Sequence, residues 1–391
     1  MSRVLVINPA LGTGGGSRWS LQAAESLAMR GHEVDWVAGA PHGEMPGWRE
    51  LSVDSFRRHL VRLRWPAAVG GRGRAWLSVM RLRELLRWCQ RQPTLKPEAV
   101  LLDCVPFAMR EVREAFPHSR IVFYCHFPEA LYAGKTQWFL RGHRQHWVER
   151  ERRGLAIADR VLVNSSYTQR HLAGIFPEVM DRVAICHPAV TAASGATGEA
   201  KHILCVARWT PEKNLPLAVQ AYAAYRAGLR AAGVAARPLI IVGAFDAASP
   251  EAHAAFTAVD EERRRLGLTP AECQLLRDPR DAELDQLYRE ALALVHPMPN
   301  EHFGMVAPEA MARGVPVIGI EGSGLADSVV PGETGFLVPP SPLAIAEKLQ
   351  QLHLEPGVRQ RLGQRARERV ASAFLVEHLG ARLESALFAA K

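Results

Sequence analysis

Long apolar runs are missing from this sequence of 391 residues. None approaches the roughly 18 residues that a membrane-spanning helix needs. At the start of the chain, residues 4–7 form only a strand-length apolar run, and Asn8-Pro9 and a glycine-rich turn follow it, a pattern that does not match a signal peptide. We therefore expect no membrane span and no leader, and a cytoplasmic protein that can lie at the cytoplasmic face of a membrane.

Cysteine is also sparse, and its positions are scattered. The six cysteines include no Cys-x-x-Cys pair; they stand at positions 89, 104, 125, 186, 205 and 273. Structural zinc sites are built from closely spaced cysteine and histidine ligands. We therefore expect reduced thiols in a cytoplasmic protein and no structural zinc.

Charge is unevenly distributed along the chain. Residues 1–190 contain 27 Lys or Arg and 17 Asp or Glu, a net charge of +10, whereas residues 191–391 contain 21 and 23, a net charge of −2. The first half is therefore expected to have a basic face. Such a face favours an anionic partner, which can be a phosphate-bearing lipid, a membrane surface or a nucleic acid.

The arginines of the first half concentrate in residues 49–95, where eleven of them stand with three acidic residues and no lysine. Tryptophan and aliphatic residues are interleaved with them, as in amphipathic helices that lie on anionic membranes. A solvated basic face over an ordinary core is the other interpretation. Nucleic acid is the least favoured partner, because no recognition motif accompanies the charge, and we expect none to bind.

With 48% hydrophobic and 23% charged residues, the chain has a globular composition and is long enough for two domains. Short β-branched runs alternate with helical stretches, which predicts an α/β fold of two Rossmann-like, doubly wound parallel sheets. The predicted strands are residues 4–7, 34–37, 100–102, 121–124, 161–163, 183–186, 203–206, 239–242, 274–276, 293–295, 316–320 and 336–338.

A small, polar stretch at residues 190–199 separates the two series of strands and is the predicted linker. It places the domains at residues 1–190 and 191–373. Ligands of open parallel sheets bind beyond the carboxyl ends of the strands. Two such domains therefore predict a site in the cleft between them.

The first predicted strand leads into a glycine-rich loop, Gly12-Thr-Gly-Gly-Gly-Ser17, and then a helix. The loop only partly matches a dinucleotide fingerprint, because Ser17 replaces the last glycine and no acidic residue follows the second strand. We therefore do not expect NAD binding. Gly14, Gly15 and Gly16 remain candidates for a loop whose amides face an anion, and a plain tight turn is the alternative.

Two polar residues follow buried strands of the first domain. His126 comes directly after the apolar run 121–125 and precedes a proline-containing loop, and Asp103 ends the run 100–102. The carboxyl end of a parallel strand is where ligand-binding side chains gather. His126 is therefore a candidate functional residue and Asp103 a weaker one, although a lone histidine is often purely structural.

In the second domain, Arg208 and Lys213 lie in the loop after strand 203–206, just before a helix expected to begin near Asn214. An arginine fork and a lysine point charge beside a helix start suit a diphosphate. Either cation alone would be unremarkable, but the acidic motif described next strengthens the prediction.

Residues 301–309 read Glu-His-Phe-Gly-Met-Val-Ala-Pro-Glu and lead into a helix and a buried strand. If that helix starts near Gly304 or Met305, its first N–H groups, including that of Val306, have no helical partner and can bind an anion. Glu301 then lies before the helix and Glu309 about a turn and a half inside it. Carboxylates around a phosphate predict a nucleotide-sugar site, whereas an ordinary acidic helix start is the alternative.

Together these motifs resemble those of the retaining glycosyltransferases of family 4, which have the GT-B fold of two facing Rossmann-like domains. The resemblance rests on the glycine-rich first loop, Arg-x-x-x-x-Lys-Asn at 208–214, Glu-x7-Glu at 301–309 and Gly-Glu-Thr-Gly at 332–335. Within the family, the chain is most similar to the α-1,3/1,6-mannosyltransferases of lipid-linked oligosaccharides. Tyr-Cys-His-Phe-Pro at 124–128 and Asn-Glu-His-Phe-Gly at 300–304 carry that similarity. The similarity is weaker across residues 40–95.

The resemblance implies roles for the candidate residues. Arg208 and Lys213 would neutralise the departing diphosphate, and the amides of Gly304, Met305 and Val306 would hold the phosphates or the sugar. Glu309 would accept hydrogens from the ribose hydroxyls and Glu301 would orient the donor sugar. From the other domain, His126 would contact that sugar, Gly14, Gly15 and Gly16 would approach the diphosphate, and Asp103 is an acceptor-site candidate.

The resemblance also implies a donor and an acceptor. The expected reaction transfers mannose from GDP-mannose, with retention, to a lipid-linked or other glycan acceptor. Residues 1–190 would bind the acceptor, residues 191–373 the nucleotide sugar, and the final helix, 374–391, would pack back on the first domain. With no Asp-x-Asp in the sequence, we expect no metal and no other cofactor. A UDP-sugar-dependent transferase, an epimerase or synthase of the same fold, and a non-catalytic nucleotide- or glycan-binding protein remain alternatives.

Overall fold

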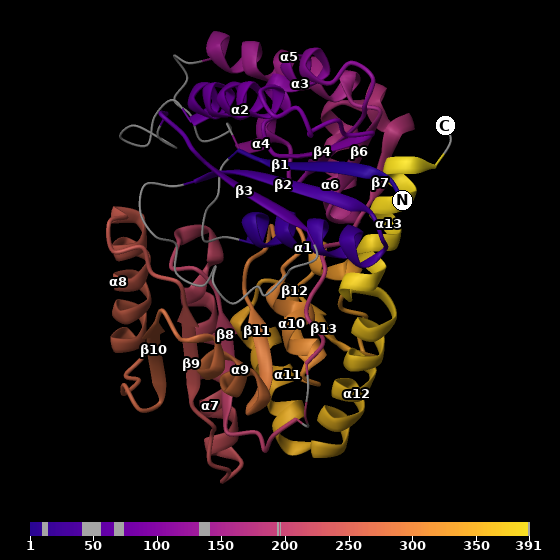
Figure 1. The fold of residues 1–391 in the computed structure, drawn as a ribbon. Helices are drawn as coiled ribbons and strands as arrows, with labels where there is room; N and C mark the ends of the chain where they lie inside the picture. The colour runs from indigo at the N-terminus through magenta and orange to yellow at the C-terminus, as the bar shows by residue number, and fades with distance from the viewer. Residues whose placement is uncertain are drawn as a thin grey trace. The chain divides into compact units, whose positions relative to one another are not determined.

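Parallel strands joined by helices make up both halves of the chain, as the alternating pattern of the sequence predicts (Figure 1). The structure is a computed structural model that describes residues 1–9, 15–40, 56–65, 74–132, 141–193, 195 and 197–389. The chain divides into two units, one of Met1–Ala189 with Val376–Lys391 and one of Val190–Leu375. Each unit is built around one parallel sheet, which confirms the predicted fold class.

The first unit contains a seven-stranded sheet with the order β3-β2-β1-β4-β5-β6-β7. Its strands are β1 (Arg3–Asn8), β2 (Glu33–Ala40), β3 (Arg57–Arg62), β4 (Ala99–Asp103), β5 (Arg120–Cys125), β6 (Arg160–Val163) and β7 (Val183–Ile185). The order reverses between β1 and β4, where chain connections leave toward opposite sides of the sheet. In doubly wound sheets this switch point is where ligands bind.

Helices cover both faces of this sheet. The helices of this unit are α1 (Gly15–Met29), α2 (Arg74–Gln90), α3 (Met109–Ala115), α4 (Glu129–Tyr132), α5 (Arg141–Ile157), α6 (Ser166–Ile175) and α13 (Val376–Phe388), with 3-10 turns at Pro106–Ala108 and Pro177–Arg182. One face packs against α2, α3, α5 and α6, and the other packs against α1 and α13. Local sequence fixes their ends; α6, for example, begins after Ser165, whose side chain accepts a hydrogen bond from the Thr168 amide.

The basic segment, residues 49–95, is not wholly helical, whereas the membrane interpretation likened it to amphipathic helices. Its described residues, 56–65 and 74–95, form the strand β3, the helix α2 and short irregular stretches; residues 49–55 and 66–73 lie outside the described residues. β3 is an edge strand paired only with β2, and of its residues only Val61 is buried. Exposed arginines around one buried side chain are typical of an edge strand. The comparison with amphipathic helices overlooked this possibility.

The second unit contains a six-stranded sheet with the order β10-β9-β8-β11-β12-β13. Its strands are β8 (His202–Val206), β9 (Leu239–Gly243), β10 (Cys273–Arg277), β11 (Ala291–His296), β12 (Val317–Ile320) and β13 (Gly335–Val338). Here the strand order reverses between β8 and β11. The second unit therefore has its own switch point.

The helices of the second unit again form two layers. They are α7 (Leu215–Ala231), α8 (Pro250–Arg265), α9 (Asp281–Arg289), α10 (Val306–Ala312), α11 (Pro342–Leu354) and α12 (Pro356–Ala373), with 3-10 turns at Pro211–Lys213 and Gly324–Asp327. α7, α8 and α11 share one core with the sheet, and α9, α10 and most of α12 share the other. α7 begins directly after Asn214, as the sequence predicts.

The chain returns to the first unit at its end. α13 packs against α1, β4 and β5 of that unit and buries Leu379, Leu383 and Leu387. The predicted linker, by contrast, is anchored to the second unit: the Val190 amide donates to Phe374 O at 2.8 Å and the Gly198 amide to Arg289 O at 3.0 Å.

The helices and the cysteines bear on two expectations from the composition, the absence of a membrane span and the presence of reduced thiols. In the part of the chain that the structure describes, no helix is both long and apolar enough to cross a membrane. All six cysteines are free, and five of them are buried. Burial raises the pKa of the Cys205 thiol to about 12, so this sulfur is an unreactive core group.

Candidate active site

The switch point of the second unit brings together the acidic and basic residues predicted from the sequence. Lys213 ends the 3-10 turn that follows β8, and Glu301 lies in the loop that follows β11. Although 88 positions separate them, Lys213 Nζ lies 2.8 Å from Glu301 Oε2. The two motifs therefore form one site, at the carboxyl ends of adjacent strands.

A histidine that the sequence analysis did not single out completes this group. His296, the last residue of β11, places Nε2 2.9 Å from the same Oε2 of Glu301, and its side chain is buried. Lys213 Nζ also contacts Met298 Sδ at 3.1 Å. His296 lies at the carboxyl end of β11, and His126 directly follows β5, so the same signal was available in the sequence.

Glu301 is a buried carboxylate held in its charged form. It is 8% exposed, and burial alone would raise its pKa. The hydrogen bond with His296 and the positive charge of Lys213 oppose this effect, and the net result is a pKa well below the ordinary value. Glu301 Oε1 also accepts a hydrogen bond from the His302 amide at 3.1 Å. The site therefore presents a fixed negative charge beside a lysine.

Gly304 allows the chain to turn from this loop into α10. Its φ is +80°, and a Cβ there would lie 2.6 Å from Leu325 Cδ2 and 3.0 Å from Glu301 Cγ. Glycine is therefore required both by conformation and by space. Met305 is the N-cap residue and Val306 the first residue of α10, one position later than the start expected from the sequence. Their amides belong to the set for which a helix supplies no partner.

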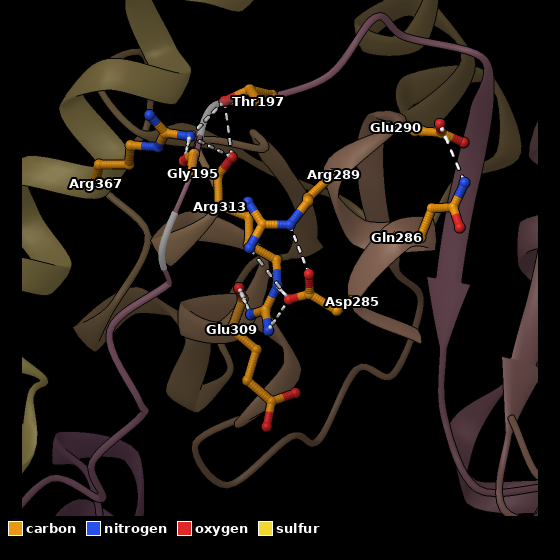
Figure 2. A network of polar contacts seen from close by, with 9 residues as sticks. All are labelled: Gly195, Thr197, Asp285, Gln286, Arg289, Glu290, Glu309, Arg313 and Arg367. Atoms are coloured by element: carbon orange, nitrogen blue, oxygen red, sulfur yellow. Dashed lines mark hydrogen bonds and ion pairs between the residues drawn. The ribbon is translucent and has the colours of Figure 1, made fainter. Parts of the chain in front are cut away.

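Glu309 lies in the first turn of α10 and is partly exposed. Its Oε2 accepts a hydrogen bond from the Tyr288 hydroxyl at 3.0 Å. Its carbonyl accepts one from Arg313 Nη1 at 2.8 Å, and Arg313 is in turn paired with Asp285 at 2.7 Å (Figure 2). α9 and α10 are thus tied together, and the network fixes the backbone that carries Glu309.

Arg208 differs from Lys213 in its surroundings. Its side chain is 58% exposed, and within the described part of the chain it is paired only with Glu212, at 3.8 Å. Such an exposed pair holds the guanidinium only weakly. Arg208 is therefore a mobile cation that can reorient toward a ligand, whereas Lys213 is fixed by Glu301.

The first unit has a second polar group at its own switch point. Asp103, at the end of β4, is fully buried and accepts a hydrogen bond from Asn8 Nδ2 at 2.9 Å. Its other oxygen lies 2.6 Å from His126 Nε2. Three neighbouring strands, β1, β4 and β5, supply these residues at their carboxyl ends. The predicted pair of Asp103 and His126 is therefore a direct contact, and Asn8 is an additional member.

Aromatic and amide groups fix the imidazole of His126. Trp19 and Tyr124 stack on each other with ring centroids 3.5 Å apart, and Tyr124 meets the His126 ring edge-on at 4.9 Å. Asn164 Nδ2 donates to the His126 carbonyl at 2.8 Å. The side chain of His126 nevertheless remains 27% exposed. His126 is thus a preorganised group that a ligand can reach.

A buried carboxylate on α5 supports the loop that follows His126. Glu151 accepts hydrogen bonds from the amides of Glu129 and Ala130, at 2.9 and 2.8 Å, at the start of α4. It is 1% exposed. Burial raises its pKa to about 7, although the two amide bonds act in the opposite direction. This role cannot be predicted from the sequence, because Glu151 stands in a helix among other charged residues.

Only part of the glycine-rich loop belongs to the described residues. Gly14 lies outside the described residues, whereas Gly15 and Gly16 are the first two residues of α1, which follows β1.

Asp103, Cys104 and His126 form a group that could hold a metal ion, with ligand atoms within 4.8 Å of one another. In this structure they are engaged with one another, since Cys104 Sγ donates to Asp103 Oδ1 at 3.3 Å.

Two family models match the chain, one to each unit. The model of glycosyltransferase family 4 matches residues 13–193, and that of glycosyl transferases group 1 matches residues 189–369. Together they span nearly the whole chain, and the second contains Lys213, His296, Glu301 and Glu309.

Relatives match over nearly their full length. The chain is 29% identical to a mouse protein named alpha-1,3/1,6-mannosyltransferase ALG2, over 95% of this chain and 92% of that one. It is 28% identical to the human protein of the same name, over 96% and 92%. The structure resembles sucrose-phosphate synthase from Thermosynechococcus elongatus with a TM-score of 0.80 at 21% identity, covering 98% of both chains. That likeness shows the fold alone.

Proposed function

Because the chain belongs to the glycosyltransferases of family 4 and group 1, we propose that it is a retaining mannosyltransferase that uses GDP-mannose. Glycosyltransferase activity follows from the family. The identity of the sugar rests on the relatives, which are named as mannosyltransferases and match more than nine-tenths of the chain.

The observation that carries the proposal is the group of Lys213, Glu301 and His296 at the switch point of the second unit. Breaking the bond between the sugar and the diphosphate leaves negative charge on the diphosphate. In our proposal Lys213 and Arg208 neutralise that charge, and the amides of Gly304, Met305 and Val306 bind the phosphates or the sugar. The carboxylate of Glu301, which is ionised at neutral pH, orients the sugar hydroxyls.

The remaining roles follow from the same donor. Glu309 accepts hydrogens from the ribose hydroxyls while Tyr288 holds its other side. Gly14, Gly15 and Gly16 approach the diphosphate. His126 contacts the donor sugar, and Asp103 orients the imidazole and lies beside the acceptor. No metal takes part, because the two cations supply the charge that a metal would otherwise provide.

The acceptor in our proposal is a glycan carried on a lipid, reached at the cytoplasmic face of a membrane. Supporting this are the exposed basic and aromatic side chains among residues 56–65 and 76–90. A UDP-sugar-dependent transferase of the same family is the second candidate, because none of the described residues assigned to the donor distinguishes guanine from uracil.

The proposal is tested by incubating the protein with GDP-mannose and a mannosylated lipid-linked acceptor in the presence of a chelator. We expect GDP release and a product whose new linkage has the α configuration by NMR, as in the donor. A β linkage would contradict retention, and dependence on added metal would contradict the metal-free mechanism. Transfer only from UDP sugars would replace the donor while leaving the family unchanged.

A further inference from the structure

A cavity of about 600 Å³ lies in the second unit at the opposite edge of the sheet from Lys213 and Glu301. Its walls include residues that precede or begin strands, namely Ala200 before β8 and Leu292 in β11, and residues of α11 and α12. Its volume lies within the range of small-molecule sites. This cavity has no part in the proposed transfer reaction.

Three arginines line the cavity, and all of them are bound through neutral groups. Arg237 Nε donates to Ala200 O at 2.7 Å, and Arg359 Nη2 donates to Ala291 O at 2.9 Å. Arg367 Nη2 donates to Thr197 Oγ1 at 2.8 Å (Figure 2). Among the described residues, none of the three forms an ion pair. Three positive charges therefore share one cavity without compensation.

Each guanidinium also has unused hydrogen-bonding capacity. Within the described part of the chain, Arg237 Nη1, Arg359 Nε and Arg367 Nε are buried and have no hydrogen-bond partner. Burial and the nearby charge of Arg237 both lower the pKa of Arg359. Buried donors without partners, and like charges close together, both cost free energy that an anion would offset.

The packing at the base of the cavity keeps these arginines in place. Gly363 of α12 approaches the turn before β12 so closely that a Cβ would lie 2.2 Å from Gly314 O. At Gly314, where φ is +71°, a Cβ would lie 2.8 Å from Arg367 Nε. α12 is thus seated directly on the turn that follows α10, and its arginines have little freedom to turn away into solvent.

We propose that this cavity binds a small phosphorylated molecule through Arg237, Arg359 and Arg367. Arginine forms paired hydrogen bonds with phosphate oxygens, and three of them around one cavity match the charge of a phosphate monoester. Among the described residues that line the cavity, Glu199 is the only carboxylate, and it is exposed at the margin. The concave shape favours a soluble molecule over a flat surface.

The test is calorimetric titration of the full chain with inorganic phosphate at constant ionic strength. Gln360→Glu places a carboxylate at the exposed margin of the cavity, next to Arg359 in the sequence. It leaves the hydrogen bonds of the three arginines described above in place. Arg359→Gln removes one charge. We expect saturable binding to the wild type that is about tenfold weaker or more in both variants.

Two controls locate the phosphate. Arg365→Gln changes an exposed arginine of the same helix that does not line the cavity, and Arg208→Ala changes the cation near the proposed donor site. Arg365→Gln should bind phosphate as the wild type does, and Arg208→Ala should keep the binding that Gln360→Glu weakens. Absence of saturable binding to the wild type would overturn the proposal. Binding that survives Gln360→Glu but is lost in Arg208→Ala would place the phosphate at the donor site and overturn it equally.

Discussion

Lys213 and His296 keep Glu301 charged in a place where a lone carboxylate would be costly. Glu301 is nearly inaccessible, and its ionised form depends on Lys213 and His296. Removing one member of such a group leaves an uncompensated buried charge, which is strongly destabilising. If a donor diphosphate draws Lys213 away, Glu301 needs another hydrogen-bonding partner. The hydroxyls of the donor sugar can supply it.

In our proposal Asp103 acts through His126, so changing both residues should cost little more activity than changing one. We predict that Asp103→Asn, which keeps the size of the side chain, lowers kcat by about 10- to 100-fold, the effect expected from losing one charge-assisted hydrogen bond at 2.6 Å. His126→Ala should have a similar effect. The measurement is steady-state kinetics of both variants and of the double variant.

If the two effects add in the double variant, the residues act separately and the proposed dependence is wrong. Ser119→Ala is a suitable control, because Ser119 is a buried polar residue of the same unit whose hydroxyl bonds to a backbone carbonyl, at 2.6 Å, away from the switch point. It should leave kcat unchanged.

At this scale the sequence singled out the charged residues but not the groups that hydrogen bond to them. Lys213, Glu301 and Glu309 stood in a pattern whose chemistry was readable. His296 and Tyr288 are ordinary residues at the end of a strand and a helix, and only the fold brings them within 3.0 Å of the carboxylates. Asn8 was noted only as a break after the first strand, although it bonds to Asp103.

At the scale of elements, the entry into α10 depends on a glycine with two separate constraints. Gly304 and Gly267 both have positive φ, +80° and +63°, but a Cβ on Gly267 would meet nothing within 4 Å. We predict that Gly304→Ala destabilises the protein by about 1–3 kcal/mol more than Gly267→Ala, because only the first creates a steric overlap. Urea denaturation of both variants measures the difference, and equal losses would show that φ alone matters.

The start of α4 should be sensitive to pH through Glu151. Its pKa is raised from 4.5 to about 7 in the folded protein, so the folded state binds the proton more tightly than the unfolded state. The associated stability is fully present below pH 4.5 and is lost as the pH rises toward 7, by roughly 3 kcal/mol. We predict that Glu151→Gln, which does not titrate, gains stability relative to the wild type across this window.

Urea denaturation of wild type and Glu151→Gln at several pH values between 4.5 and 8 provides the comparison. Glu149→Gln is the matched control, since Glu149 lies on the same helix and its side chain is 46% exposed. A constant difference between wild type and Glu151→Gln over the whole range would contradict a raised pKa at Glu151.

All twelve strands expected from the sequence are present. A thirteenth strand, β3, was not expected, and its composition explains why. Central parallel strands are buried on both faces and appear as continuous apolar runs. β3 is an edge strand in which arginines surround a single buried residue, Val61, while Leu60 is 62% exposed. A run so polar is compatible with a helix until its partner strand is known.

At the scale of the whole molecule, the uneven charge suggests contact with an anionic membrane. In the first unit, Trp65 and Trp76 are 40% and 47% exposed and pack edge to face, and the Arg64 side chain is 92% exposed. We predict that the protein sediments with anionic vesicles at low salt and is released at high salt. The double variant Trp65→Ser, Trp76→Ser should bind several-fold more weakly.

Leu343→Ser, which changes a residue of the second unit that is 72% exposed, should bind vesicles as the wild type does. Failure of the wild type to sediment with vesicles at low salt would remove the membrane from the account and favour a soluble glycan acceptor.

The central claim is that the second unit binds GDP-mannose through Lys213. Calorimetric titration with GDP, GDP-mannose, UDP-glucose and UDP-N-acetylglucosamine, without added metal, tests it most directly. We predict that GDP and GDP-mannose bind at least about tenfold more tightly than the UDP sugars, and that Lys213→Ala loses this binding while remaining folded by circular dichroism. Preference for a UDP sugar would contradict the assigned donor, and no nucleotide binding at all would contradict the site itself.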